Sequence, residues 1–113
     1  MIKIKILIVD DEVDFCLLME SYFSEKDYEV FLSFTLQDGL DALEKVNPDI
    51  LFLDNNLPDG EGWQHSDEII KKFPSLKINL ISAYHPDKRN LNSKSNVRIW
   101  EKPISLNSLN ELF

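Results

Sequence analysis

The sequence is short of cysteine and of long apolar runs, and each shortage excludes a class of protein. Its single cysteine, Cys16, excludes an intramolecular disulfide and fits a reducing compartment. The longest apolar block, residues 6–9, is far shorter than the ~20 residues that span a bilayer. Acidic residues at 10–12 stand where a secretory signal would need a cleavage site. We therefore expect a cytoplasmic domain without membrane contact.

Basic residues are also scarce. The chain has 12 of them and 20 acidic residues, which gives a formal net charge of −8. Such a chain repels phosphate backbones, so we expect no direct nucleic-acid binding and a preference for cationic ligands or partners. The 113 residues suit one domain, 1–113, and a 43% hydrophobic content is typical of a globular protein rather than a disordered one.

Hydrophobic periodicity predicts strands that alternate with helices. Helical spacing fills residues 12–26, where Phe15, Leu18, Met19, Tyr22 and Phe23 share a face, and Thr35 is placed to cap the next helix. Later helices end at Pro74 and near Phe113, and a loop is expected over residues 55–62. Strand-like runs occupy residues 2–9, 28–34, 50–53, 76–81 and 97–100. This alternation predicts an α/β fold with a parallel sheet covered by helices on both faces.

The polar residues that follow these strands are the informative feature. Asp10 and Asp11 follow the first strand, Asp54 the third, Ser82 the fourth and Lys102 the fifth. Taken singly, each is most often a cap, a turn residue or a solvated charge. In open α/β sheets, however, the carboxyl ends of the strands meet at one edge, where ligands bind. The sequence therefore predicts that three carboxylates, a hydroxyl and an ammonium converge there.

Clustered carboxylates repel, and a divalent cation and the Lys102 ammonium are the two candidates that offset the repulsion. An oxygen-only site with room for water suits Mg²⁺ better than zinc, which prefers histidine and cysteine. With the metal in place, one carboxylate can act as a nucleophile towards phosphorus. His65 and His85 lack partners at metal-ligand spacing and are predicted to be exposed polar residues, and Cys16 is predicted to serve packing.

Four segments together resemble the receiver domain of two-component response regulators. They are LIVDDE (7–12), LFLDNNLPDGEG (51–62), LISA (80–83) and EKP (101–103), and the resemblance covers essentially the whole chain. It implies a flavodoxin-like, or CheY-like, five-stranded parallel sheet in the order 2-1-3-4-5. The region 83–96 has one large aliphatic residue, Leu91, which indicates a short or irregular fourth helix. The fifth helix is also expected to be short, because the sequence reaches Phe113 after barely two helical turns.

The resemblance also implies a role for each site residue. Asp54 would accept a phosphoryl group from a sensor histidine kinase or a phosphotransfer protein. Mg²⁺ would be bound by Asp11 and Asp54, by Asp10 through water and by the backbone carbonyl of Asn56. Phosphoryl oxygens would be bound by Lys102 and by the Ser82 hydroxyl, the peptide bond before Pro103 would be cis, and Asn56 and Tyr84 would tune water access.

The chain departs from the family pattern near its end. Ile99 stands where an aromatic switch residue is usual, and Trp100 beside it is expected to be a core residue. The sequence leaves open how the signal is transmitted. The alternatives are a homodimer, a downstream output protein and an output domain that follows Phe113. Two alternative functions are those of a phosphorylation-independent pseudo-receiver, which acts as an interaction module, and of a Mg²⁺-dependent phosphohydrolase. The phosphohydrolase motif would need aspartate where Glu12 stands.

Overall fold

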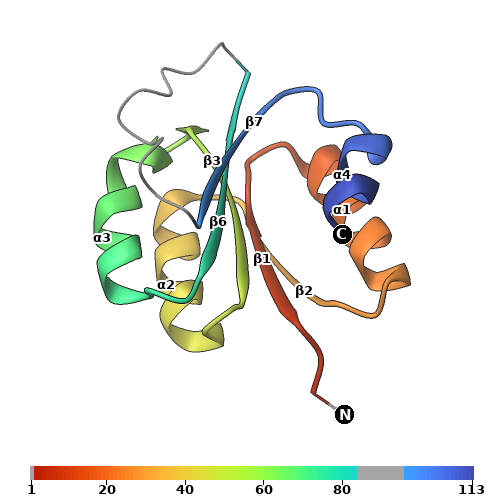
Figure 1. Ribbon diagram of the computed structural model, residues 1–113. Coiled ribbons are helices and arrows are strands. Elements are labelled where there is room, and N and C mark those ends of the chain that lie inside the picture. The colour runs from red at the N-terminus through yellow and green to blue at the C-terminus, as the bar shows by residue number, and fades with distance from the viewer. Residues whose placement is uncertain (1, 84–95) are drawn as a thin grey trace.

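A parallel sheet between two helical layers forms the framework of the protein (Figure 1), which a computed structural model describes for residues 2–83 and 96–113. Its strands lie in the order β2-β1-β3-β6-β7, so the predicted order 2-1-3-4-5 and the flavodoxin-like fold are confirmed. The strands of this sheet are β1 (Lys5–Val9), β2 (Glu29–Ser33), β3 (Ile50–Asp54), β6 (Lys77–Ser82) and β7 (Val97–Glu101).

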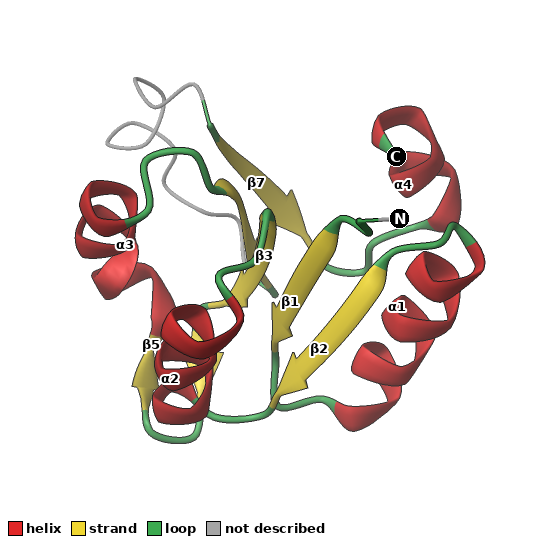
Figure 2. Ribbon diagram, turned by 90° about the horizontal axis from the view of Figure 1, so that it is seen from below, coloured by secondary structure: helices red, strands yellow, loops and turns green. Residues whose placement is uncertain are grey.

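Helices cover both faces of the sheet, as expected for parallel strands joined by crossovers. Figures 1 and 2 show α2 and α3 on one side and α1 and α4 on the other. Thr35 caps α2 as predicted, because its hydroxyl oxygen accepts the Asp38 N–H at 3.1 Å. The helices are α1 (Val13–Glu25), α2 (Leu36–Val46), the 3₁₀ turn η1 (Gly62–His65), α3 (Ser66–Lys72) and α4 (Leu106–Leu112).

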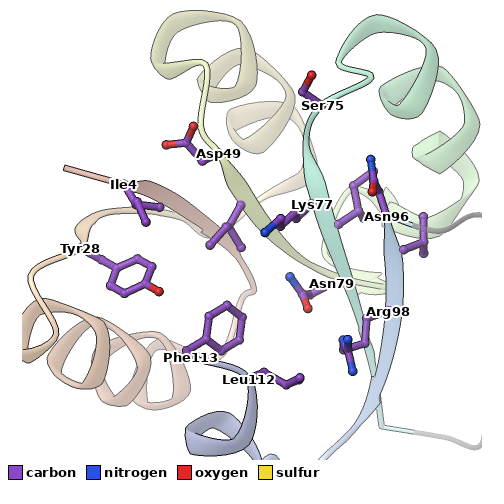
Figure 3. Close-up of a pocket in the computed structure, with 13 residues that line it drawn as sticks. Ile4, Tyr28, Asp49, Ser75, Lys77, Asn79, Asn96, Arg98, Leu112 and Phe113 are labelled. Atoms are coloured by element: carbon purple, nitrogen blue, oxygen red, sulfur yellow. The ribbon is translucent and has the colours of Figure 1, made fainter. Parts of the chain in front are cut away.

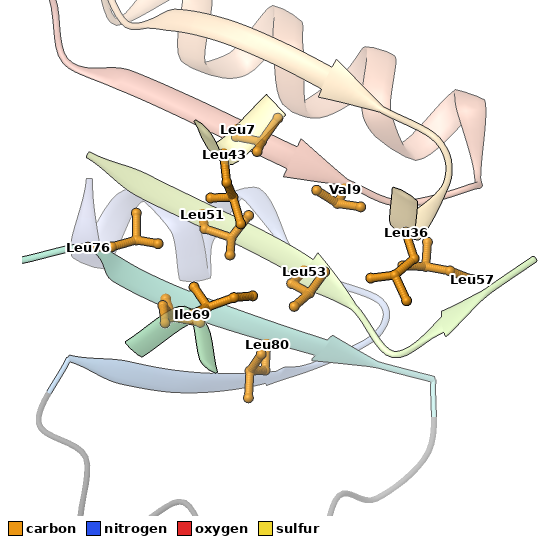
Figure 4. Packing of buried hydrophobic residues seen from close by; sticks show 11 residues of the cluster. Leu7, Val9, Leu36, Leu43, Leu51, Leu53, Leu57, Ile69, Leu76 and Leu80 are labelled. Atoms are coloured by element: carbon orange, nitrogen blue, oxygen red, sulfur yellow. The ribbon is translucent and has the colours of Figure 1, made fainter. Parts of the chain in front are cut away.

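The sheet separates two apolar clusters, and alternate residues of β1 feed each of them. Leu7 and Val9 pack towards α2 and α3, whereas Ile6 and Ile8 pack towards α1 and α4. Figure 4 shows the first cluster, in which Leu51 and Leu53 of β3 lie on the same face of the sheet as Leu7 and Val9 of β1 and Leu80 of β6. Burial on both faces explains why β1 reads as a continuous apolar run in the sequence.

The second cluster corrects the predicted face of α1. Cys16, Met19 and Phe23 are buried, but Leu18 is 50% exposed. The buried stripe therefore starts at Cys16 rather than at Phe15, which is only partly buried. The prediction was wrong for Leu18 only, because Met19 and Phe23 lie in the cluster and Phe15 and Tyr22 pack against it. The apolar spacing of α1 also fits a neighbouring stripe, and packing against the sheet buries Cys16 in place of Leu18. The burial of Cys16 and Trp100 confirms that both are core residues.

Other expectations differ at their boundaries. Strand β1 begins at Lys5 rather than at residue 2, and the predicted loop 55–62 contains a two-stranded antiparallel hairpin of β4 (Asn56–Leu57) and β5 (Gly60–Glu61). The predicted fourth helix lies outside the described residues, as do Tyr84 and His85. Within residues 2–83 and 96–113, no helix combines the length and apolarity that crossing a bilayer requires.

Candidate functional site

The ends of four parallel strands bring together most of the polar residues that the sequence singles out. Asp10 follows β1, Asp54 ends β3, Ser82 ends β6 and Lys102 follows β7. The strand register fixes their neighbourhood, because Asp54 pairs with Ile81 and Ser82 pairs with Glu101. The backbone N–H of Lys102 also donates to the Ser82 carbonyl at 2.8 Å. These contacts place one polar edge where an open α/β sheet binds ligands.

Asp10, Asp11 and Asp54 form a carboxylate cluster in which one oxygen from each residue lies within 4.8 Å of the others. Asp10 and Asp54 are almost fully buried, with exposed fractions of 0% and 3%, and Asp11 is exposed. One Asp10 oxygen, Oδ1, accepts the Glu12 N–H at 2.8 Å. The cluster therefore has two inner carboxylates and one at the solvent boundary.

Lys102 is the cation that faces this cluster. Its Nζ lies 2.9 Å from Asp10 Oδ2 and 4.0 Å from Asp54 Oδ1. The nearest carboxylate oxygen is Glu12 Oε1, at 2.6 Å. The ammonium also lies 5.0 Å from the centre of the Phe15 ring, a cation–π contact. The Lys102–Pro103 peptide bond is cis.

The electrostatics of the site show how strongly these charges interact. Burial and the charge of Asp10 raise the pKa of Asp54 to about 6, against the opposing effect of Lys102. Burial likewise raises the pKa of Asp10. Burial by itself lowers the pKa of Lys102, but its contacts with Glu12, Asp10 and Asp54 outweigh burial and raise it. The site therefore favours a charged Lys102 ammonium and disfavours ionisation of its two buried carboxyl groups.

The residues fit a divalent cation. Asp10 Oδ2 is buried and receives no hydrogen bond of normal geometry, although the Lys102 ammonium lies beside it. The cluster supplies carboxylate oxygens from an exposed and two buried residues, which is the hard oxygen donor set that Mg²⁺ prefers. A cation at this position would offset the charge of Asp10, which adds to burial in raising the pKa of Asp54.

Two further predicted residues lie at the edge of the cluster. Ser82 is 5% exposed at the end of β6, in the strand next to Asp54. Asn56 is exposed in β4, and its backbone N–H bonds to the Asp54 carboxylate, which lowers the pKa of that group slightly against the dominant effect of burial. Their roles towards metal and phosphoryl oxygens remain predictions.

The sequence reasoning missed the partner of Lys102. The sequence assigns Glu12 no contact within the site, yet its carboxylate lies nearer to the ammonium than that of Asp10 or Asp54. The available signal was its position, directly after Asp11 at the carboxyl end of β1. His65 is half-buried rather than exposed, and lies 3.9 Å from Glu68.

A separate pocket of about 550 Å³ lies at the opposite edge of the sheet (Figure 3). It is lined where the strands begin, by residues such as Ile4, Asp49, Lys77 and Asn96, together with Phe113. None of its lining residues belongs to the carboxylate cluster. The pocket is therefore separate from the chemistry of that site, whatever its size.

The fold and the site together define a class, an open parallel α/β domain with a carboxylate cluster and a lysine at the carboxyl edge of its sheet. Residues 6–113 match the response regulator receiver domain family, and the chain belongs to that family. Such domains are signalling domains rather than metabolic enzymes, and this membership supports a part in phosphorelay signalling.

Individual relatives agree with this assignment. The chain is 34% identical over 83 residues to the chemotaxis protein CheY of Listeria monocytogenes, which covers 71% of this chain and 68% of that protein. It is also similar to a solved CheY-like receiver domain from Methanospirillum hungatei, with a TM-score of 0.86, 26% identity and coverage of 97% and 90% of the two chains. The response regulator TrrA of Thermotoga maritima, solved in complex with Mg²⁺ and BeF, gives a TM-score of 0.80 and 28% identity over 96% of this chain and 94% of that chain.

Proposed function

We propose that the protein is a Mg²⁺-dependent phosphoacceptor switch that takes a phosphoryl group on Asp54. The observation that carries the proposal is the approach of Asp10, Asp11 and Asp54 to within 4.8 Å of one another beside the Lys102 ammonium. The phosphoryl donor is a sensor histidine kinase or a phosphotransfer protein, and the output passes to a partner protein, a second copy or a further domain.

The chemical step is an in-line transfer at phosphorus. A carboxylate oxygen of Asp54 forms a bond to phosphorus while the bond from phosphorus to the donor's leaving atom breaks, and the electron pair leaves with the donor. With a pKa of about 6, Asp54 is mostly ionised at neutral pH and is therefore a competent nucleophile. Mg²⁺, when bound, offsets the negative charge on the transferring oxygens.

The other residues of the site hold the phosphoryl group. Asp11, Asp54 and the Asn56 carbonyl would hold the cation directly and Asp10 would hold it through water, and the Lys102 ammonium pairs with a phosphoryl oxygen. The Ser82 hydroxyl bonds another oxygen, and its strand lies beside that of Asp54. Because Lys102 N–H is bonded to the Ser82 carbonyl, the two phosphoryl-binding residues move together. This link favours a shift of β6, β7 and the adjoining segments as the output.

The test is the intact mass of the protein after incubation with acetyl phosphate and Mg²⁺. The wild-type protein is expected to gain the mass of one phosphoryl group, and the gain is expected to vanish with EDTA or in Asp54→Ala. Asp67→Asn, an exposed acid on α3, is the matched control and should be modified like the wild type. An unmodified wild type, or equal modification of Asp54→Ala, contradicts the proposal and favours a pseudo-receiver that acts only by interaction.

A further inference from the structure

The contacts of Lys102 are unequal in a way that the phosphoacceptor role does not require. Its Nζ lies 2.6 Å from Glu12 Oε1 but 4.0 Å from Asp54 Oδ1. In the described part of the chain, the lysine is therefore held most closely by a carboxylate that has no assigned part in cation or phosphoryl binding. A charge-assisted contact of this length is strong for its type.

Two hydrogen bonds hold the backbone of Glu12 in place beside the carboxylate cluster. Its N–H donates to Asp10 Oδ1 at 2.8 Å, and its carbonyl accepts the Cys16 N–H at 3.0 Å. Glu12 occupies the N-cap position of α1, yet its side chain makes no capping hydrogen bond. The side chain instead reaches Lys102 from the solvent boundary.

We propose that Glu12 is a positioning residue that holds the Lys102 ammonium away from Asp54 in the unphosphorylated protein and competes with the phosphoryl group for it. This role rests on the proposed function. The phosphoryl group adds negative charge beside Asp54, and Lys102 exchanges Glu12 for a phosphoryl oxygen when that charge arrives. The Glu12 side chain is 62% exposed, so water readily solvates its carboxylate after the exchange.

The size of the effect follows from that exposure. Ion pairs with one solvent-exposed partner contribute modestly, so removal of the Glu12 charge is expected to change the affinity for a phosphoryl mimic about two- to fivefold. The direction separates this role from cation binding. A restraining Glu12 weakens binding of the mimic, whereas a Glu12 that helped to bind Mg²⁺ would strengthen it.

The experiment measures beryllium fluoride binding at saturating Mg²⁺, with Mg²⁺ affinity measured separately. Glu12→Gln keeps the size and the backbone contacts of the residue, and Asp14→Asn removes the same charge from an exposed position in the first turn of α1. Glu12→Gln is expected to bind beryllium fluoride about two- to fivefold more tightly than both the wild type and Asp14→Asn. Equal or weaker binding in Glu12→Gln, or the same gain in Asp14→Asn, overturns the role of Glu12 and leaves the proposed function intact.

A second readout does not depend on binding. In the metal-free protein, the NMR signal of the Lys102 Cε group is expected to shift in Glu12→Gln and to stay in place in Asp14→Asn. An unshifted signal in Glu12→Gln overturns the pairing. Absence of beryllium fluoride binding by the wild type itself overturns the proposed function, and the role of Glu12 with it.

Discussion

The indole N–H of Trp100 donates a hydrogen bond to Asn79 Oδ1 at 2.9 Å inside the sheet. The Asn79 amide in turn donates to the Leu51 carbonyl at 3.3 Å. Leu51, Asn79 and Trp100 lie on the neighbouring strands β3, β6 and β7, a few residues before Asp54, Ser82 and Lys102. This buried network therefore ties together the strand that ends at Asp54, the strand that ends at Ser82 and the strand that leads into Lys102.

Replacing Asn79 by alanine is expected to lower the free energy of unfolding by about 1–3 kcal/mol, because the Trp100 N–H loses its buried partner. Urea denaturation of Asn79→Ala, Trp100→Phe and the double variant measures the loss. The double variant should lose less than the sum of the single losses, since each substitution already breaks the same bond. Strict additivity would show that the bond contributes nothing.

The stability of the metal-free protein is expected to depend on Asp54 and pH. Because the pKa of Asp54 is raised from 3.8 to about 6, its contribution is fully present below pH 3.8 and is lost as pH rises through about 6. Asp54→Asn should therefore be more stable than the wild type at pH 8 in EDTA, by at most about 3 kcal/mol, and the gap should close at pH 4. Chemical denaturation at both pH values measures it, and a gap that is equal at pH 4 and pH 8 would contradict the raised pKa.

Asp59 is expected to have the opposite pH dependence. Its two carboxylate oxygens accept the Leu36 and Gln37 N–H groups at the start of α2, at 2.7 and 2.9 Å, and these bonds hold the pKa of Asp59 below its usual value. The contribution is present above pH 3.8 and is lost as pH falls through the lowered pKa. Asp59→Asn should melt at a lower temperature than the wild type at pH 7, and this difference should disappear at strongly acidic pH. Glu25→Gln, an exposed charge on α1, is the control and should leave the melting temperature unchanged.

Gly62 permits the close approach of the loop to Asp54. A Cβ atom at this position would lie 2.3 Å from the Asp54 carbonyl oxygen and 2.9 Å from Leu53 Cδ1. Gly62→Ala is expected to lower the free energy of unfolding by about 1–3 kcal/mol and to weaken Mg²⁺ binding, because the backbone that carries Asp54 must shift. In Gly39→Ala the three atoms nearest to the added carbon would be side-chain atoms of Val9, so stability should fall while Mg²⁺ affinity is kept. Unchanged Mg²⁺ affinity in Gly62→Ala would show that the loop tolerates the shift.

The sequence was sufficient for the sheet and for the place of the site. Buried parallel strands leave continuous apolar runs, and the polar residues that end them meet at one edge by topology alone. The missed features are side-chain contacts between segments far apart in the chain, such as Glu12 with Lys102 and the Asp59 carboxylate with the backbone N–H groups at the start of α2. Hydrophobic periodicity and motif spacing do not predict these contacts, because each segment contains several polar residues that could make them. Leu18 illustrates the same limit in the core, where two helical stripes compete and only packing selects between them.

We propose that Asp10, Asp11 and Asp54 meet Lys102 around one cation that prepares Asp54 for a phosphoryl group. Calorimetric titration of beryllium fluoride, which mimics that group, into the protein with and without Mg²⁺ tests it most directly. Beryllium fluoride is expected to bind one-to-one, to require Mg²⁺ and to fail to bind in both Asp54→Ala and Asp11→Ala. Binding that is independent of Mg²⁺, or that persists without the Asp54 carboxylate, would contradict it.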